Sequence, residues 1–168
     1  MELLREITEK DVGLDNIESF TLPYTLRKAA RAILFNDSNE IALLHVANNK
    51  YHKLPGGGVE EGEDLRTALA REALEEVGSK IKVQNDVGII VEYRNEIKEL
   101  QISYCFTAET IGKLSVPEFT DKEKNDGFRL LWTPLENAIQ LLSDDKPDDY
   151  IGKFIQVRDL IFLRKIAE

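Results

Sequence analysis

The sequence predicts an α+β fold in which strands dominate, with one central helix and further helices near the end of the chain. Several short runs rich in Ile, Val, Tyr and Phe are separated by polar turns, which is typical of strands. Asp64–Val77 has helix-forming residues throughout, and Tyr150–Ala167 has apolar residues at helical spacing. Because strands and helices do not alternate regularly, we expect an α+β or three-layer arrangement instead of a βαβ repeat.

The predicted strands lie on both sides of the central helix. Ala29–Phe35 and Ile41–Val46 flank the turn residues Asn36–Asn39, so they are expected to form a β-hairpin. Tyr51–Leu54 is expected to be a short strand that leads into Pro55–Gly58. After the central helix, strands are predicted at Lys80–Tyr93, Leu100–Glu109 and Phe128–Trp132, with a polar turn near Arg94–Lys98 between the first two.

The predicted helices have recognisable ends. Gly78 follows Asp64–Val77 at the position of a C-terminal cap. Pro134–Leu142 begins with proline, which is favoured in the first turn of a helix. Tyr150–Ala167 is predicted to be a terminal amphipathic helix, and Pro117–Asp126 to be a polar, mostly acidic loop.

Composition limits the class of protein. The chain has 168 residues, 42% of them hydrophobic, and no linker-like tract, so we expect a single domain over 1–168 with a leading segment at about 1–23. A net charge of −9 argues against nucleic acid as a partner. No apolar run is long enough to span a membrane, and the single Cys105 cannot form an internal disulfide. A cytoplasmic protein is predicted.

The central helix places acidic residues on an apolar stripe. A helical wheel puts Leu65, Ala68 and Leu69 in the same sector as Glu72, Glu75 and Glu76. Like charges three and four residues apart destabilise a helix, and more so near a packed interior. A divalent cation such as Mg²⁺ would neutralise them, since it prefers oxygen ligands. The alternative is a solvated acidic patch.

The residues around this helix resemble the Nudix box, written G-x5-E-x7-R-E-U-x-E-E-x-G-U with U a bulky aliphatic residue. From Gly57 the chain reads GGVEEGEDLRTALAREALEEVGS. All seven fixed positions are matched, by Gly57, Glu63, Arg71, Glu72, Glu75, Glu76 and Gly78. Ala73 and Ser79 depart from the two aliphatic positions, neither of which carries charge. The resemblance implies a Nudix-type α/β/α sandwich around a mixed, partly barrel-like sheet.

The same resemblance implies roles for individual residues. It makes Glu72, Glu75 and Glu76, with the carbonyl of Gly56, the ligands of a catalytic Mg²⁺ or Mn²⁺. Glu72 and Arg71 are the candidate catalytic residues, Arg71 by orienting the glutamates. Glu63 is expected to pair within the loop–helix–loop. The general base is left open: Glu72 is preferred, and Glu118, Glu123 and Asp126 are the alternatives from the acidic loop.

Residues outside the box have open interpretations. Arg27 and Arg31 lie on the same face of a strand, where they either meet substrate phosphates or form part of a salt-bridged sheet face. Phe128 and Trp132 are core residues or base-stacking platforms. Tyr93, Tyr104 and Phe106 line the pocket or fill the core. His45 and His52 are assigned to packing or surface roles, and Cys105 to a buried position.

The predicted activity is the hydrolysis of a diphosphate linkage in a nucleotide-like substrate. ADP-ribose hydrolases of the family often carry a proline shortly beyond the box. Residues 91–95 have none, so (deoxy)nucleoside triphosphates, oxidised ones included, are favoured over ADP-ribose and nucleotide sugars. An isomerase would need a reactive cysteine, and a non-catalytic nucleotide sensor would commonly lose box glutamates. A homodimer, through the leading segment or the terminal helix, is a further possibility.

Overall fold

The computed structural model describes residues 1–14 and 23–168. Of the predicted leading segment, residues 15–22 therefore lie outside the described part. The strands are β1 (Leu3–Ile7), β2 (Thr25–Phe35), β3 (Ile41–Val46), β4 (Tyr51–Lys53), β5 (Lys80–Arg94), β6 (Glu99–Ile111) and β7 (Phe128–Thr133). The helices are α1 (Leu65–Val77), α2 (Asp121–Asn125), α3 (Leu135–Asp144) and α4 (Tyr150–Ala167), with short 3₁₀ turns at Glu9–Val12, Ala47–Asn49 and Asn95–Ile97.

The described strands form one mixed sheet in the order β1-β5-β6-β2-β3-β4, with β7 paired to β3. β1 and β2 run parallel to their neighbours β5 and β6, and β5 and β6 run antiparallel to each other. The sheet is not closed into a barrel, because β1 and β4 stand at opposite ends of this order. The α+β prediction is confirmed.

The predicted hairpin between β2 and β3 is almost absent. The two strands pair only at Phe35 and Ile41, where the turn joins them. β2 pairs with β6 along its whole length, and β3 pairs with β7 along its whole length. The turn forms as predicted, but beyond it β2 donates hydrogen bonds from Ala30 and Ala32 to residues 55–57, and β3 pairs with β4.

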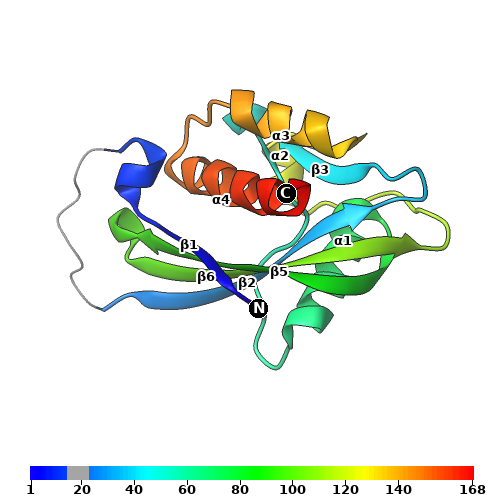
Figure 1. The fold of residues 1–168 in the computed structure, drawn as a ribbon, viewed down its shortest axis with the longest axis horizontal. Coiled ribbons are helices and arrows are strands. Elements are labelled where there is room, and N and C mark those ends of the chain that lie inside the picture. The colour runs from blue at the N-terminus through cyan, green and yellow to red at the C-terminus, as the bar shows by residue number, and fades with distance from the viewer. Residues whose placement is uncertain (15–22) are drawn as a thin grey trace.

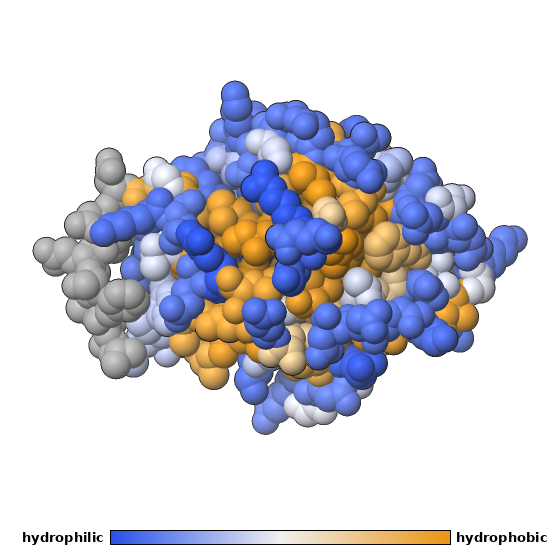
Figure 2. Space-filling view, in the orientation of Figure 1, coloured by the Kyte–Doolittle hydropathy of each residue, from blue (hydrophilic) through white to orange (hydrophobic). Residues whose placement is uncertain are grey.

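The helices pack on both faces of the sheet, α3 and α4 on one face and α1 on the other, and an apolar core lies between the sheet and the helices on each face (Figure 1). The alternation along β2 divides the cores: Ile33 belongs to the α3–α4 side, whereas Ala30, Ala32 and Leu34 belong to the α1 side. Figure 2 shows hydrophobic residues gathered over the middle of the face drawn in Figure 1, with hydrophilic residues around them. The sheet is thus the middle layer of a sandwich.

Helix α1 begins and ends where the sequence predicts. The Asp64 side chain accepts a hydrogen bond from the Thr67 N–H, and Gly78 ends the helix in the left-handed conformation. Ala70 and Leu74, however, are exposed. The helix is therefore an outer layer, and its buried side, which includes Ala73 and Val77, packs on the sheet.

Three other elements differ in detail from the sequence prediction. β2 begins at Thr25, four residues earlier than expected, because β6 continues to pair with it there. Residues 121–125 of the predicted acidic loop form the short helix α2, which a capping box between Thr120 and Glu123 starts. Pro134 is the N-terminal cap of α3 and not its first helical residue.

Candidate active site

The glycine-rich segment between β4 and α1 is docked on the edge of β2. The Ala30 N–H donates to the Gly57 carbonyl and the Ala32 N–H to the Pro55 carbonyl, both at 3.0 Å. Gly56 has a φ of 126°, and a Cβ there would lie 2.1 Å from the Ala30 carbonyl oxygen. Only glycine fits this approach, so β2 holds the segment at a defined distance from α1.

Glu76 lies at the centre of this arrangement and is 1% exposed. Its carboxylate accepts hydrogen bonds from Lys53 Nζ and from the backbone N–H of Gly56, both at 2.7 Å. Burial raises the pKa of Glu76, while the Lys53 charge acts in the opposite direction. A buried carboxylate held by one lysine and the glycine segment is a preformed site for positive charge.

Arg71 organises the acidic residues around it. Its guanidinium donates to both oxygens of Glu63, at 2.9 and 3.1 Å, and to the Gly58 carbonyl at 3.1 Å. It also contacts Glu72 at 2.9 Å and Glu75 at 3.4 Å. The hydrogen bonds to Glu63 raise the pKa of Arg71 further, so the cation is permanent. Arg71 therefore ties the glycine segment to the helix.

Glu72 and Glu75 face different surroundings. A Cβ at Gly57 would lie only 2.2 Å from Glu72 Oε1, so the glycine leaves room for this carboxylate. The Glu75 side chain is 45% exposed, and its pKa is raised by burial and then by the Glu72 charge. Within 1–14 and 23–168, no three acidic, histidine or cysteine side chains are gathered closely enough to form a ready metal cage. Lys53 and Arg71 instead hold the carboxylates.

A cavity of about 420 Å³ opens beside these carboxylates. Glu72 and Glu76 line it, whereas Glu75 does not. Of the alternative general bases, Glu123 and Asp126 line the cavity, but Glu118 does not. Glu118 donates its backbone N–H to the Glu75 carbonyl at 2.7 Å. Glu123 Oε2 accepts hydrogen bonds from the N–H and hydroxyl of Thr120, within the cap of α2.

Basic side chains line the same cavity, and the sequence indicated only two of them. The five basic residues are Arg27, Arg31, Lys53, Arg94 and Lys122, of which the sequence indicated Arg27 and Arg31. Lys53 and Arg94 belong to no sequence motif. They reach the cavity only because β4 and the end of β5 lie beside the glycine segment. Helix α4 supplies the apolar wall through Ile151 and Ile155. The cavity thus combines five arginine and lysine residues with five acidic ones, which are Glu72, Glu76, Glu99, Glu123 and Asp126.

A buried polar network supports the cavity from the α4 side. Glu92 and Arg158 are both 0% exposed, and Glu92 accepts hydrogen bonds from Arg94, Gln101 and Ser103 at 2.7–3.0 Å. The neighbouring Asp159 accepts from the Leu54 N–H at 2.8 Å, directly before the glycine segment. Local sequence patterns do not indicate this network, because its members come from β5, β6, α4 and the residue that follows β4.

The remaining open interpretations divide between core and cavity. Phe128 lines the cavity, and Lys53 Nζ lies 5.0 Å from its ring centre. Trp132 packs in the core beside α1, and Cys105 is buried, which raises the pKa of its thiol. The rings of His45 and His52 stack at 4.5 Å, and His52 bonds to Asp145 at 2.9 Å. Neither histidine lines the cavity, in agreement with a packing role.

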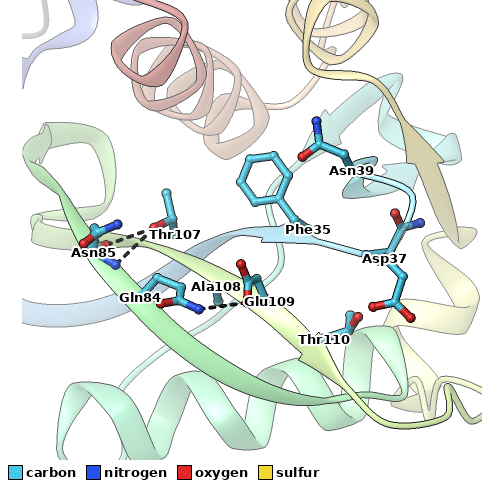
Figure 3. A pocket seen from close by; sticks show the side chains of 10 residues that line it. Phe35, Asp37, Asn39, Gln84, Asn85, Thr107, Ala108, Glu109 and Thr110 are labelled. Atoms are coloured by element: carbon cyan, nitrogen blue, oxygen red, sulfur yellow. Dashed lines mark hydrogen bonds between the residues drawn. The ribbon is translucent and has the colours of Figure 1, made fainter.

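A second cavity, of about 570 Å³, lies near the end of β2 and contains none of the predicted site residues (Figure 3). Its polar side chains largely satisfy one another: Gln84 donates to Glu109 at 2.8 Å, and Thr107 accepts from the Asn85 N–H at 3.1 Å. Its lining includes no lysine or arginine. The smaller cavity is therefore the candidate active site.

An α/β/α sandwich with a glycine segment and a glutamate-bearing helix at one cavity defines a class of phosphate-handling protein. The model of the NUDIX domain matches residues 25–153. The chain therefore belongs to the NUDIX family. No helix in the described residues combines the length and apolar content that crossing a membrane requires.

Sequence relatives agree with this assignment. Diphosphoinositol polyphosphate phosphohydrolase 2 of Rattus norvegicus is 32% identical over 124 residues, covering 72% of this chain and 65% of that protein. The chain thus spans slightly less than two thirds of that relative's length. Diphosphoinositol polyphosphate phosphohydrolase 3-alpha of Homo sapiens is 28% identical over 128 residues, with 74% of each chain covered.

Solved structures show the same fold at low identity. The MutT protein of Methanosarcina mazei Go1 has a TM-score of 0.59 at 19% identity, covering 88% of this chain and all of that one. An ADP-ribose pyrophosphatase of Streptococcus suis has a TM-score of 0.55 at 19% identity, covering 86% of this chain and 93% of that one. The Nudix-type fold predicted from the sequence is confirmed.

Proposed function

We propose that this chain is a Mg²⁺-dependent hydrolase that cleaves a diphosphate linkage in a small phosphorylated substrate. The observation that carries the proposal is the pair Glu72 and Glu76 at the cavity, held against the glycine segment by Arg71 and Lys53. The oxygen donors suit Mg²⁺, with Mn²⁺ as an alternative, and the four carboxylates of Glu63, Glu72, Glu75 and Glu76 are contacted by only two cations of the described residues, Arg71 and Lys53. The donor set therefore fits the predicted ion.

The candidate ligands would be Glu72, Glu75, Glu76 and the Gly56 carbonyl. When bound, a divalent cation polarises phosphoryl oxygens and lowers the pKa of a coordinated water. Arg71 keeps the helix and the glycine segment at one distance, because it contacts both. Lys53 is an internal counter-charge for Glu76 and must share this carboxylate with any incoming cation.

Glu72 is the preferred general base. Its carboxylate lines the cavity and is close to the Gly57 backbone, so it can accept a proton from water beside the substrate. Asp126 is the strongest alternative, because Glu123 already accepts the capping hydrogen bonds of α2 and Glu118 does not line the cavity. Water then attacks one phosphorus, and a phosphorylated product leaves.

Two substrate classes deserve direct comparison. Nucleoside triphosphates, including oxidised ones, follow from the missing proline beyond the box. Diphosphoinositol polyphosphates are the second class, favoured by the names of the sequence relatives and by the five basic residues in the cavity lining. Both classes are dense in phosphate, which arginine and lysine side chains in the cavity lining can bind.

The test is turnover of both classes, with nucleotide sugars and ADP-ribose for comparison, in Mg²⁺ and in EDTA. E72Q and E76Q are expected to reduce turnover at least a hundredfold, whereas E136Q on α3 leaves it unchanged. Substrate binding without turnover of any diphosphate would refute the hydrolase and favour a nucleotide sensor. Full activity in EDTA would refute the metal requirement.

A further inference from the structure

Two arginines of β2 have no acidic partner in the part of the chain that the structure describes. Arg27 and Arg31 are four residues apart in a strand and therefore lie on the same face. Neither has a carboxylate within salt-bridge distance among the residues that the structure describes. Arg27 Nη1 donates to the Gln101 amide, which is neutral. Among the described residues, the salt-bridged sheet face considered from the sequence is therefore not formed.

Arg31 is the more unusual of the two. It is 4% exposed, and its Nε and Nη1 atoms have no hydrogen-bond partner within 1–14 and 23–168. Burial, and then the nearby charge of Arg158, lower the pKa of Arg31 to about 10, so it still carries its charge at neutral pH. A buried, charged and unpartnered guanidinium is costly unless something else binds it.

Neighbouring carboxylates do not supply that partner. They are already paired with other cations: Glu92 and Glu99 with Arg94, Asp159 with Arg158, and Glu76 with Lys53. These four carboxylates thus form ion pairs with three other cations, and no salt bridge joins any of them to Arg31 or Arg27.

Both arginines lie against the glycine segment. A Cβ at Gly56 would be 3.0 Å from the Arg31 Cα, and a Cβ at Gly58 would be 3.1 Å from Arg27 Nη2. Both side chains line the cavity that Glu72 and Glu76 also line. An anion in this cavity would therefore meet the Arg31 guanidinium, whose Nε and Nη1 have no partner among the described residues, and beside it Arg27, which bonds only to a neutral amide.

We propose that Arg31, with Arg27 beside it, forms an anion subsite that binds a phosphoryl group of the substrate next to the scissile diphosphate. Guanidinium groups bind phosphate through paired, charge-assisted hydrogen bonds. The inference rests on the proposed function and narrows its substrate class. A diphosphate diester has no third phosphoryl group, so it cannot supply a phosphate oxygen to Arg31 in addition to its scissile diphosphate. The subsite favours substrates with a further phosphoryl group over ADP-ribose and nucleotide sugars.

The experiment measures binding of inorganic tripolyphosphate and pyrophosphate by calorimetry in EDTA, where neither hydrolysis nor a metal contributes. We compare the wild-type chain with R31M, R31K and the control R164M, which alters an exposed arginine of α4. R31M is expected to weaken tripolyphosphate binding at least tenfold, as the loss of a charged hydrogen bond predicts. R31K keeps the positive charge but loses the paired N–H donors of the guanidinium group. Its affinity for tripolyphosphate should therefore lie between those of R31M and the wild type.

Melting temperatures separate a binding role from a structural one. Because Arg31 is an unpartnered buried cation, R31M should melt at the same temperature as the wild type or higher. In turnover assays of a triphosphate, R31M should raise KM more than it lowers kcat. Undiminished tripolyphosphate binding in R31M, or a clearly lower melting temperature without loss of binding, overturns the proposal.

If R31M does not fold, R31K decides the question, and unchanged tripolyphosphate affinity in R31K overturns the subsite. The result is independent of the hydrolase test. A chain that binds tripolyphosphate through Arg31 but turns over no diphosphate keeps the subsite and refutes only the hydrolase.

Discussion

Replacing Glu92 by glutamine should destabilise the fold strongly although the two side chains have nearly the same shape. Glu92 is 0% exposed and faces Arg94 at 2.9 Å and Arg158 at 3.6 Å. The amide of glutamine keeps some hydrogen bonds, including those from the polar neighbours, but removes the one carboxylate that Arg94 and Arg158 share, which leaves Glu99 to Arg94 and Asp159 to Arg158.

The size of the effect follows from the burial. Removing one partner of a buried ion pair costs about 3–5 kcal/mol, because the remaining charge stays desolvated. For a chain of this size each kcal/mol lowers the melting temperature by roughly 2–4 °C, so E92Q should melt roughly 6–20 °C lower. Urea unfolding of the wild type, E92Q and the control E2Q, at an exposed glutamate, measures the loss. E2Q should change stability by less than about 0.5 kcal/mol.

The pH dependence gives a second check on the same residue. Burial alone raises the pKa of Glu92, but the charges of Arg158 and Arg94 outweigh it and lower the pKa overall. The stability from Glu92 is therefore fully present above the unfolded pKa of about 4.3, and is lost as pH falls through the lowered folded value. The difference between wild type and E92Q should be constant near neutral pH and shrink below about pH 4. A loss under about 1 kcal/mol at pH 7, or a difference that grows in acid, would refute the reasoning.

Two further substitutions test the loop–helix–loop. G57A places a Cβ 2.2 Å from Glu72 Oε1, so that carboxylate must move. We expect kcat to fall roughly a hundredfold with little change in melting temperature. Unchanged kcat would show that the position of Glu72 is not critical. R71K keeps the positive charge but loses the two-pronged contact with Glu63, so kcat/KM should fall about tenfold or more, whereas R66K on the same helix should be neutral. Equal activities of R71K and R66K would contradict the organising role of Arg71.

Sequence patterns predict the structural features that depend on residues close together in the chain, such as helix ends. The ends of α1 follow from Asp64 and Gly78, because caps act within one turn of a helix. The long strands β5 and β6 and the terminal helix α4 were likewise visible as apolar periodicity. The hairpin prediction for β2 and β3 was wrong beyond the turn, since strand partners are chosen by the whole sheet and not by the turn that joins two strands.

The sequence by itself determined the family, the order of most elements and the run of carboxylates on one helix, because fixed spacing along a helix fixes a face. Only the tertiary structure decided what those carboxylates meet. Lys53, Arg31 and Asp159 come from three different elements and carry no motif, yet sheet pairing and the packing of α4 bring them to the glycine segment. Because these side chains are buried, each desolvated charge needs a partner close in space. Local sequence does not show which residues are close in space.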